Sequence, residues 1–161
     1  MLFGEWSFDG ITVRDIGLVR YLNLDPIYLP HTGGRHEGSG GDKSRVTSVV
    51  RHAFKIINLR SGRNPVETLV RAVENSAPNE DTTRIGYGGV VYRLAVDISP
   101  QRRIDLALRY IVRGIRESTF SNRLTLEEIL ATQLIGAANN DQNAFSIRRK
   151  LEVERIALSS R

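Results

Sequence analysis

Cysteine is absent from this sequence, and only three of its 23 basic residues are lysines. Without thiols the chain can form neither disulfide bonds nor thiolate metal sites, and nothing indicates secretion. Long hydrophobic runs are also missing. None approaches the ~20 apolar residues that a membrane-spanning helix requires, and no signal peptide opens the chain. These absences predict a soluble, cytoplasmic protein with no membrane partner.

Catalytic motifs are missing as well. The sequence contains no P-loop, no dinucleotide-binding fingerprint, no paired catalytic carboxylates and no Ser/His/Asp set. The glycine-rich stretches GYGG and GSGG do not lead from a strand into a helix start, as a phosphate-binding loop must. A metal site built from His31, His36 and His52 has no support from ligand spacing. We therefore expect no enzyme activity, no catalytic residue, no metal and no cofactor.

Positive charge is modest in amount but uneven in placement. The 161 residues can form one domain with a sizeable core, and the formal net charge is +5. Residues 1–83 hold ten basic and ten acidic side chains, whereas residues 84–161 hold thirteen basic and eight acidic ones. Arginine dominates, and it binds phosphate at two points and stacks on bases. A GC-rich or heat-adapted genome can explain the arginine total, but not this clustering.

Residues 81–98 have the pattern of a β-hairpin. Side chains alternate between two faces from Val90 to Ile98, which predicts a half-buried strand, and Thr82–Ile85 is its expected partner. A tight turn needs positive φ angles, which glycine adopts without strain. Three glycines can supply them: Gly86, Gly88 and Gly89.

Tyr87 lies between the glycines of this turn, and Arg84 and Arg93 flank it in the two strands. At such a position the ring has little of its own domain to pack on. An aromatic face beside two guanidinium groups suits an unpaired base or a ribose. The alternative is a tyrosine that folds back onto its strand. We interpret the hairpin tip as a contact surface.

Ser99 and Pro100 predict the start of a basic amphipathic helix that continues to Arg116. Ser99 can accept a hydrogen bond from a first-turn amide, and Pro100 has no amide hydrogen to leave unpaired there. At about 100° per residue, four arginines share an arc of roughly 60°: Arg102, Arg109, Arg113 and Arg116. The opposite side carries Ile104, Ala107, Leu108, Ile111 and Ile115. A solvated face normally mixes charges, so an arginine stripe without acids favours contact with nucleic-acid phosphates, with Arg103 reaching sideways.

Four further helices are predicted from apolar spacing and capping signals. They are Lys43–Arg60, ended by Gly62; a helix opened by the capping box Asn64–Glu67 and ended before Pro78; a helix opened by the box Thr125–Glu128; and Ser146–Leu158. The last begins with Arg148, Arg149 and Lys150 and continues through Arg155. Positive charge in a first turn opposes the helix dipole, so this cluster is a second candidate for phosphate contact.

Residues 1–41 have no helical period and are expected to form an extended arm, with a strand or one helical turn near Ile16–Tyr21. Such arms often lie across a partner, and Arg35 and His36 are candidate RNA contacts within it. The predicted fold is mainly α: a helical bundle with a protruding β-hairpin and an extended N-terminal arm. Its organisation is an arm and linker over residues 1–41 and a helical RNA-binding domain over residues 42–161.

Long segments of the chain resemble the S-seven family of small-subunit ribosomal proteins (universal uS-seven), in its archaeal and eukaryotic-type branch. They are LFGEWSFDGITVRDIGLVRYLNLDPIYLPHTGGRH, NPVETLVRAVENSAPNEDTTRI, YGGVVYRLAVDISPQRRIDLALRYI and FSIRRKLEVERIALSSR. The resemblance implies a helical bundle with a β-hairpin that binds small-subunit ribosomal RNA and nucleates assembly of the head on the ribosome. It places the hairpin near exit-site tRNA and messenger RNA, and implies contact with neighbouring head proteins.

One departure from the family is large. Where the family has a basic segment and a complete first helix, this chain has only GSGG, at residues 38–41. Four such residues have the composition of a flexible linker. An engineered deletion and a natural loss both fit. Either leaves the apolar face of the Lys43–Arg60 helix one neighbour short.

Two other classes of protein remain open at this stage. A DNA-binding or architectural protein could place the arginine helix in a major groove, although no helix–turn–helix spacing is present. An RNA-free scaffold would result if too much had been lost. The RNA-binding candidates are Arg35, His36, Arg84, Tyr87, Arg93, Arg102, Arg103, Arg109, Arg113, Arg116, Arg148, Arg149, Lys150 and Arg155.

Overall fold

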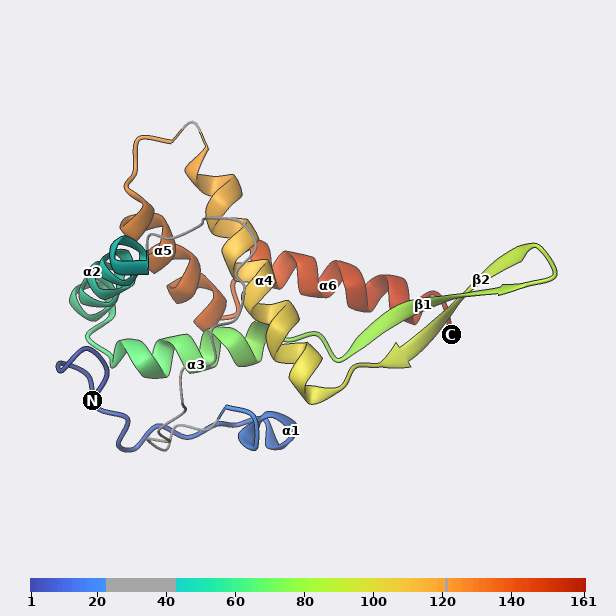
Figure 1. Cartoon of the computed structure of the whole chain (residues 1–161), viewed down its shortest axis with the longest axis horizontal. Coiled ribbons are helices and arrows are strands. Elements are labelled where there is room, and N and C mark those ends of the chain that lie inside the picture. The colour runs from blue at the N-terminus through green and yellow to red at the C-terminus, as the bar shows by residue number, and fades with distance from the viewer. Residues whose placement is uncertain (23–42, 121) are drawn as a thin grey trace.

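The computed structural model describes residues 1–22, 43–120 and 122–161. Its elements, in chain order, are α1 Ile16–Val19, α2 Lys43–Ser61, α3 Pro65–Ser76, β1 Glu80–Tyr87, β2 Val90–Asp97, α4 Pro100–Thr119, α5 Leu126–Ala138 and α6 Phe145–Leu158. The predicted fold, mainly α with a β-hairpin, is confirmed (Figure 1). The GSGG stretch, Arg35 and His36 lie outside the described residues. None of the helices in the described ranges is long and apolar enough to cross a membrane.

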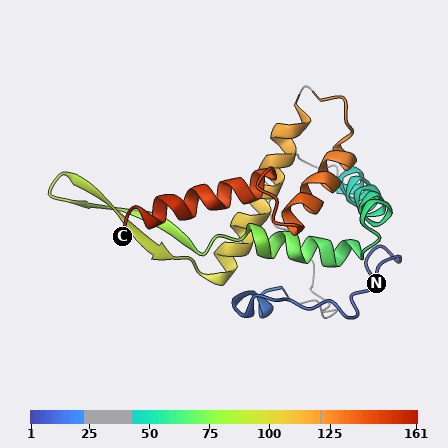
Figure 2. The ribbon, with the colours of Figure 1, turned by 180° about the vertical axis from the view of Figure 1, so that it is seen from behind.

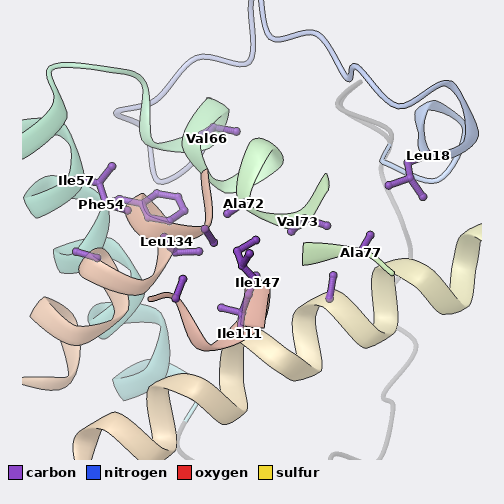
Figure 3. Close-up of a cluster of buried hydrophobic side chains, with 14 residues drawn as sticks. Leu18, Phe54, Ile57, Val66, Ala72, Val73, Ala77, Ile111, Leu134 and Ile147 are labelled. Carbon is purple, nitrogen blue, oxygen red and sulfur yellow. The ribbon is translucent and has the colours of Figure 1, made fainter. Parts of the chain in front are cut away.

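The core lies where α2, α3, α4 and α6 meet around α5, which packs against all four. Phe54 and Ile57 of α2 meet Leu134 of α5, while Ile111 of α4 and Ile147 of α6 close the other side (Figure 3). All five side chains are at most 5% exposed. Burying apolar surface of this kind is the main force that holds helices with little intrinsic stability together.

Helix ends follow the capping signals in part. Gly62 ends α2 at φ 65°, and Thr125 with Glu128 forms the predicted reciprocal capping box of α5. Asn64 caps α3 through the Val66 amide, but the expected reciprocal bond is absent because Glu67 pairs with Arg71 instead. The predicted helix start is confirmed, because Ser99 is the N-cap of α4, but its side chain makes no capping hydrogen bond. Pro100 at the first position still fixes a helical φ there.

The hairpin pairs β1 with β2 antiparallel, and Tyr87 is the partner of Val90 across a two-residue turn. Gly88 and Gly89 have φ angles of 59° and 83°, as this class of turn requires. Gly86, also expected at positive φ, is instead an ordinary strand residue opposite Val91. Figure 1 shows the hairpin extending away from the bundle, beyond the C-terminal end of α6.

The prediction of a half-buried second strand was wrong for most of its length. Residues 90–94 are all exposed, and only Ala95 and Val96 are partly covered. Alternation in sequence shows which side chains share a face, but burial needs a second layer. Here α6 packs only against the base of the ribbon, where Arg161 pairs with Glu80.

The described part of the N-terminal arm runs along α3 (Figure 2). The Glu74 carboxylate accepts hydrogen bonds from the backbone amides of Arg14 and Asp15, at 2.5 and 3.1 Å. Phe3 packs edge-on against Phe54, and Leu18 of the short helix α1 is fully buried. The expected helical turn near Ile16–Tyr21 is therefore present, and the arm is anchored at several points.

Candidate nucleic-acid interface

The outer face of α4 carries the predicted arginine stripe. Arg102, Arg109, Arg113 and Arg116 are all exposed, whereas Ala107 and Ile111 on the opposite face are buried. Leu108, expected on the core face, is 45% exposed. Its position on the helical wheel lies at the edge of the apolar arc.

The sequence pattern predicted an arginine stripe without acids, but two carboxylates lie near it in the structure. The Arg113 Nε lies 3.9 Å from a Glu117 carboxylate oxygen one turn later, and an Arg102 nitrogen lies 3.9 Å from Asp81. Arg102 and Arg113 are more than 60% exposed. Long, exposed ion pairs of this kind contribute little. A phosphate can therefore replace either carboxylate at small cost.

A groove of about 720 Å³ lies between α4 and α6, and we call it the basic groove. Its apolar floor includes Phe145 and Leu151. Its guanidinium groups come from both helices: Arg113 from α4, and Arg148, Arg149 and Arg155 from α6. Glu117 and Glu152 also line it, so positive charge exceeds negative charge along its length.

Gly114 sets the spacing of the two helices beside this groove. A Cβ atom at Gly114 would lie only 2.7 Å from the Cβ of Phe145, closer than van der Waals contact allows. The Arg148 guanidinium lies 5.7 Å from the centre of the Phe145 ring, within the range of a cation–π contact. Phe145 is thus wedged against α4 and supports an arginine above it.

The basic first turn of α6 divides between two environments. Arg148 and Arg149 reach the basic groove, where Arg149 is 2.5 Å from Glu152. Lys150 points the other way, and its Nζ donates to the Asn75 carbonyl at 2.9 Å. Asn75 is in the last turn of α3, where carbonyls lack helical partners and the dipole is negative. Lys150 therefore closes the end of α3, which offsets the cost of its place in α6.

Arg103 is placed apart from the stripe. Its side chain is only 12% exposed, and it donates to Asp15 Oδ2 at 2.7 Å and to the Pro78 carbonyl at 3.1 Å. These bonds join the N-terminal arm, α4 and the end of α3. A guanidinium held by two internal acceptors has few donors left for a phosphate. We leave Arg103 and Lys150 out of the surface proposed below.

At the hairpin, Arg84 and Arg93 are directly opposite each other, and both are exposed. Like charges on opposite strands repel, so an anion between them would stabilise the ribbon. Tyr87 is described only through its backbone, as the last residue of β1. The hairpin residues lie far along the ribbon from the basic groove, so the two form separate candidate contacts (Figure 1).

Tyr110 of α4 lies near the charged side chains of Arg149, Asp81, Arg102 and Arg109. Burial raises the pKa of its phenol above the ordinary value, and the nearby Arg149 opposes that rise. The phenol is therefore neutral near pH 7. Sequence reasoning missed Phe145 and Gln142 as parts of the basic groove, and Gly114 as the residue that sets the helix spacing beside it. A glycine inside an otherwise regular helix was the one available signal.

Comparison with known proteins agrees with this architecture. The family described as "Ribosomal protein S7p/S5e" matches residues 35–161. The chain is 43% identical over 183 residues to small ribosomal subunit protein uS7 of Methanothermobacter thermautotrophicus, covering 99% of this chain and 98% of the relative. For uS7 of Cenarchaeum symbiosum the identity is 46% over 192 residues, with 100% and 96% covered. For uS7 of Methanosphaera stadtmanae it is 41% over 182 residues, with 99% and 97% covered.

These relatives are archaeal, as the sequence resemblance predicted, and they are structural ribosomal proteins rather than enzymes. The match extends over essentially the whole chain and includes the hairpin, the arginine helix and α6. The chain belongs to the S7p/S5e family of small-subunit ribosomal proteins, in its archaeal-type branch.

Proposed function

We propose that this protein binds small-subunit ribosomal RNA through a continuous basic surface made by α4 and α6. The observation that carries the proposal is the junction of the exposed arginines of α4 with the basic groove. Arg113 belongs to both, and Arg148 and Arg155 extend the surface onto α6. Family membership implies ribosomal RNA as the ligand and the cytoplasmic ribosome as the location. The particular residues are our assignment.

The chemistry of the surface suits a folded RNA backbone. Arginine presents a planar fork of donors that matches phosphate oxygens, and its exposed ion pairs exchange readily. Several guanidinium groups along two helices can meet phosphates of adjacent backbone segments. Binding of this kind releases counterions and depends strongly on salt.

We further propose that the hairpin acts as a separate contact near exit-site tRNA and messenger RNA. It carries large apolar side chains with little cover: Val91 and Tyr92 are 63% and 60% exposed. A ribbon with two exposed faces and an arginine pair fits a partner that offers both stacking surfaces and phosphates. From family membership we also propose that the bundle nucleates assembly of the small-subunit head, beside neighbouring head proteins.

One comparison of ligands tests the proposal. The protein is titrated with a small-subunit ribosomal RNA head fragment and with duplex DNA of equal charge, at the same salt concentration. We expect tight binding to the RNA fragment and only weak, non-specific binding to DNA. Equal affinity for both would favour a general DNA-binding or architectural protein. Binding to neither would identify a folded scaffold without RNA activity.

A further inference from the structure

The hairpin leaves the bundle through a short and tightly held connection. Residues 77–79 link the end of α3 to the start of β1, and two of them, Ala77 and Pro78, are fully buried. We call residues 75–80 the hairpin root. Figures 1 and 2 both show the root between α4 and α6. Its surroundings therefore decide the direction in which the ribbon extends.

Helix α6 holds the hairpin root at two points one turn apart. Lys150 Nζ donates to the Asn75 carbonyl at 2.9 Å, and the Glu154 carboxylate accepts from the Asn79 amide at 3.0 Å. Lys150 and Glu154 are four residues apart, so they lie on the same face of α6. Asn75 comes before the bend between α3 and β1, and Asn79 comes after it. Because the two bonds bracket the bend, they fix the angle at which the strand leaves the helix.

Further hydrogen bonds join the hairpin root to the other helices. Arg103 Nε of α4 donates to the Pro78 carbonyl at 3.1 Å. Ser76 Oγ donates to Ser146 Oγ of α6 at 2.9 Å, and both residues are at most 2% exposed. Asn75 Nδ2 donates to two carbonyl groups in the last turn of α5. The root is therefore bonded to α4, α5 and α6 at once.

Beyond its root, the ribbon has little cover that could hold it in place. Residues 83–86 and 88–94 are exposed. Strands of 8 residues at ~3.3 Å per residue reach about 26 Å from the root. A tilt of about 10° at the root would therefore move the tip by roughly 4–5 Å. A displacement of that size exceeds the length of a hydrogen bond, so the position of the tip depends on how firmly the root is held.

We propose that Lys150 is a positioning residue, which together with Arg103 and Glu154 fixes the direction of the hairpin relative to the RNA-binding surface of α4 and α6. The proposal rests on the function proposed above, in which the hairpin and that surface are separate contacts. A ribbon whose direction is already set lets a folded RNA engage both contacts without a further loss of conformational freedom. Two basic residues that the RNA-binding surface leaves out, Arg103 and Lys150, thereby contribute to binding indirectly.

The absence of cysteine makes a distance measurement direct. Spin labels on Val91→Cys in the hairpin, 63% exposed, and Leu59→Cys in α2, 84% exposed, report the direction of the ribbon by pulsed electron paramagnetic resonance without RNA. Labels on Leu59→Cys and Leu108→Cys, 45% exposed in α4, report the bundle alone. Both pairs should give one narrow distribution of distances. In Lys150→Met the hairpin distribution should widen by roughly 4–5 Å, while the bundle distribution should not change.

Two matched variants serve as controls. Arg155→Met removes the same charge from an exposed position of α6 and should leave both distributions unchanged. Lys150→Arg keeps a donor and should retain the narrow hairpin distribution. If Lys150→Met also widens the bundle distribution, the milder Glu154→Leu decides by the same two distances, because Asn79 is exposed and water can solvate its amide.

Three results would overturn the proposal. They are a hairpin distribution that stays narrow without the Lys150 amine, one that is already broad in the original chain, and a salt slope of RNA binding that flattens in Lys150→Met. The last would show that Lys150 binds a phosphate directly. Because the distances are measured without RNA, a negative result there leaves the assignment of the α4–α6 surface to RNA intact.

Discussion

The basic groove and a second groove flank the same helix, yet their solvation differs. We call the second one the apolar groove; its lining comes from α2, α4 and α5 and includes Val46, Val49, Val112, Ile115, Leu126 and Leu130. On one side of α4, the exposed Arg113, Arg148 and Arg155 line the basic groove beside two glutamates. On the other side, Val112 and Ile115 face a cavity with almost no polar lining. Water solvates guanidinium groups well, so the basic groove costs little when it is empty. Apolar surface left in water forfeits the free energy that burial would have supplied.

The two sides of α4 should therefore contribute differently, one mainly to RNA binding and the other mainly to stability. An empty basic groove should affect only RNA affinity, whereas an empty apolar groove should lower stability and, through α4, affinity as well. Added salt should weaken RNA binding at the basic groove but not apolar packing at the apolar groove, since ions screen charges but not apolar contacts. The predictions below test this division, beginning with the largest expected effect.

Filling the apolar groove in cis should have the largest effect on stability. Replacing GSGG by a first helix like that of the family should cover side chains such as Val46 and Val112, each worth up to ~1.5–3 kcal/mol. We expect the melting temperature to rise by about 5–15 °C and RNA affinity to increase with it, as measured by calorimetry and RNA titration. A matched serine- and glycine-rich insert is the control. If neither quantity rises, the segment is dispensable and the fold already accommodates its loss.

Overpacking the contact between α4 and α6 should have the second-largest effect on stability. Gly114→Ala would put a Cβ 2.7 Å from the Phe145 Cβ, and overpacking of this kind typically costs about 1–3 kcal/mol. The control is Gly136→Ala in α5, where the nearest atom, Ala144 Cβ, is 3.4 Å away. That change should be neutral or slightly stabilising, because alanine favours helix. Chemical denaturation of both variants measures the difference, and equal stabilities would argue against a tight α4–α6 contact.

Removing the acid that holds Arg103 should have a smaller effect. Asp15→Asn keeps the cap of α1 but leaves a mostly buried guanidinium without its charged partner. We expect a loss of about 1–2 kcal/mol, less than for a fully buried pair because Asp15 is 32% exposed. The salt dependence of RNA binding should not change. Asp81→Asn, which removes a 3.9 Å exposed pair with Arg102, should change stability by less than about 0.5 kcal/mol.

Shortening the hairpin should affect stability least. Residues 86–91 are replaced by a two-residue Asn-Gly turn, which keeps the Ile85–Tyr92 pair in register. Because residues 90–94 are all exposed, the melting temperature should change by no more than a few degrees. Holding of messenger RNA and exit-site tRNA by reconstituted subunits should weaken instead. A large drop in melting temperature would show that the tip supports the fold.

Local signals in the sequence predicted much of this fold. Apolar spacing, Gly62 and the Thr125–Glu128 box located α2, α5 and α6 to within a residue or two, because those signals act within one element. The arginine helix α4 extends three residues beyond its predicted end at Arg116. The resemblance to the family supplied the hairpin-and-bundle arrangement. Burial of the second strand was mispredicted, because it depends on whether another layer covers it, and no residue in the strand encodes that.

The roles of individual basic residues were less accessible. In the sequence, Arg103 resembles a surface residue beside the arginine stripe, and Lys150 resembles a free charge near the start of a helix. In the structure, Arg103 donates to Asp15 and Lys150 donates to the Asn75 carbonyl. Those partners lie 88 and 75 positions away along the chain, and they meet through the packing of the arm on α4 and of α3 on α6. The fold therefore decides which positive charges are free for RNA and which are used internally.

The salt dependence of RNA binding tests the central claim most directly. Arg109→Gln with Arg113→Gln removes two exposed arginines of α4, and Arg20→Gln with Arg63→Gln removes two exposed arginines outside the α4–α6 surface. Log affinity for the ribosomal RNA fragment is plotted against log salt for each protein. The α4 pair should weaken binding and flatten the slope by roughly 0.7–0.9 for each lost phosphate contact, while the control pair leaves the slope nearly unchanged. Equal slopes for the wild type and the α4 variant would contradict the assignment of this surface to RNA.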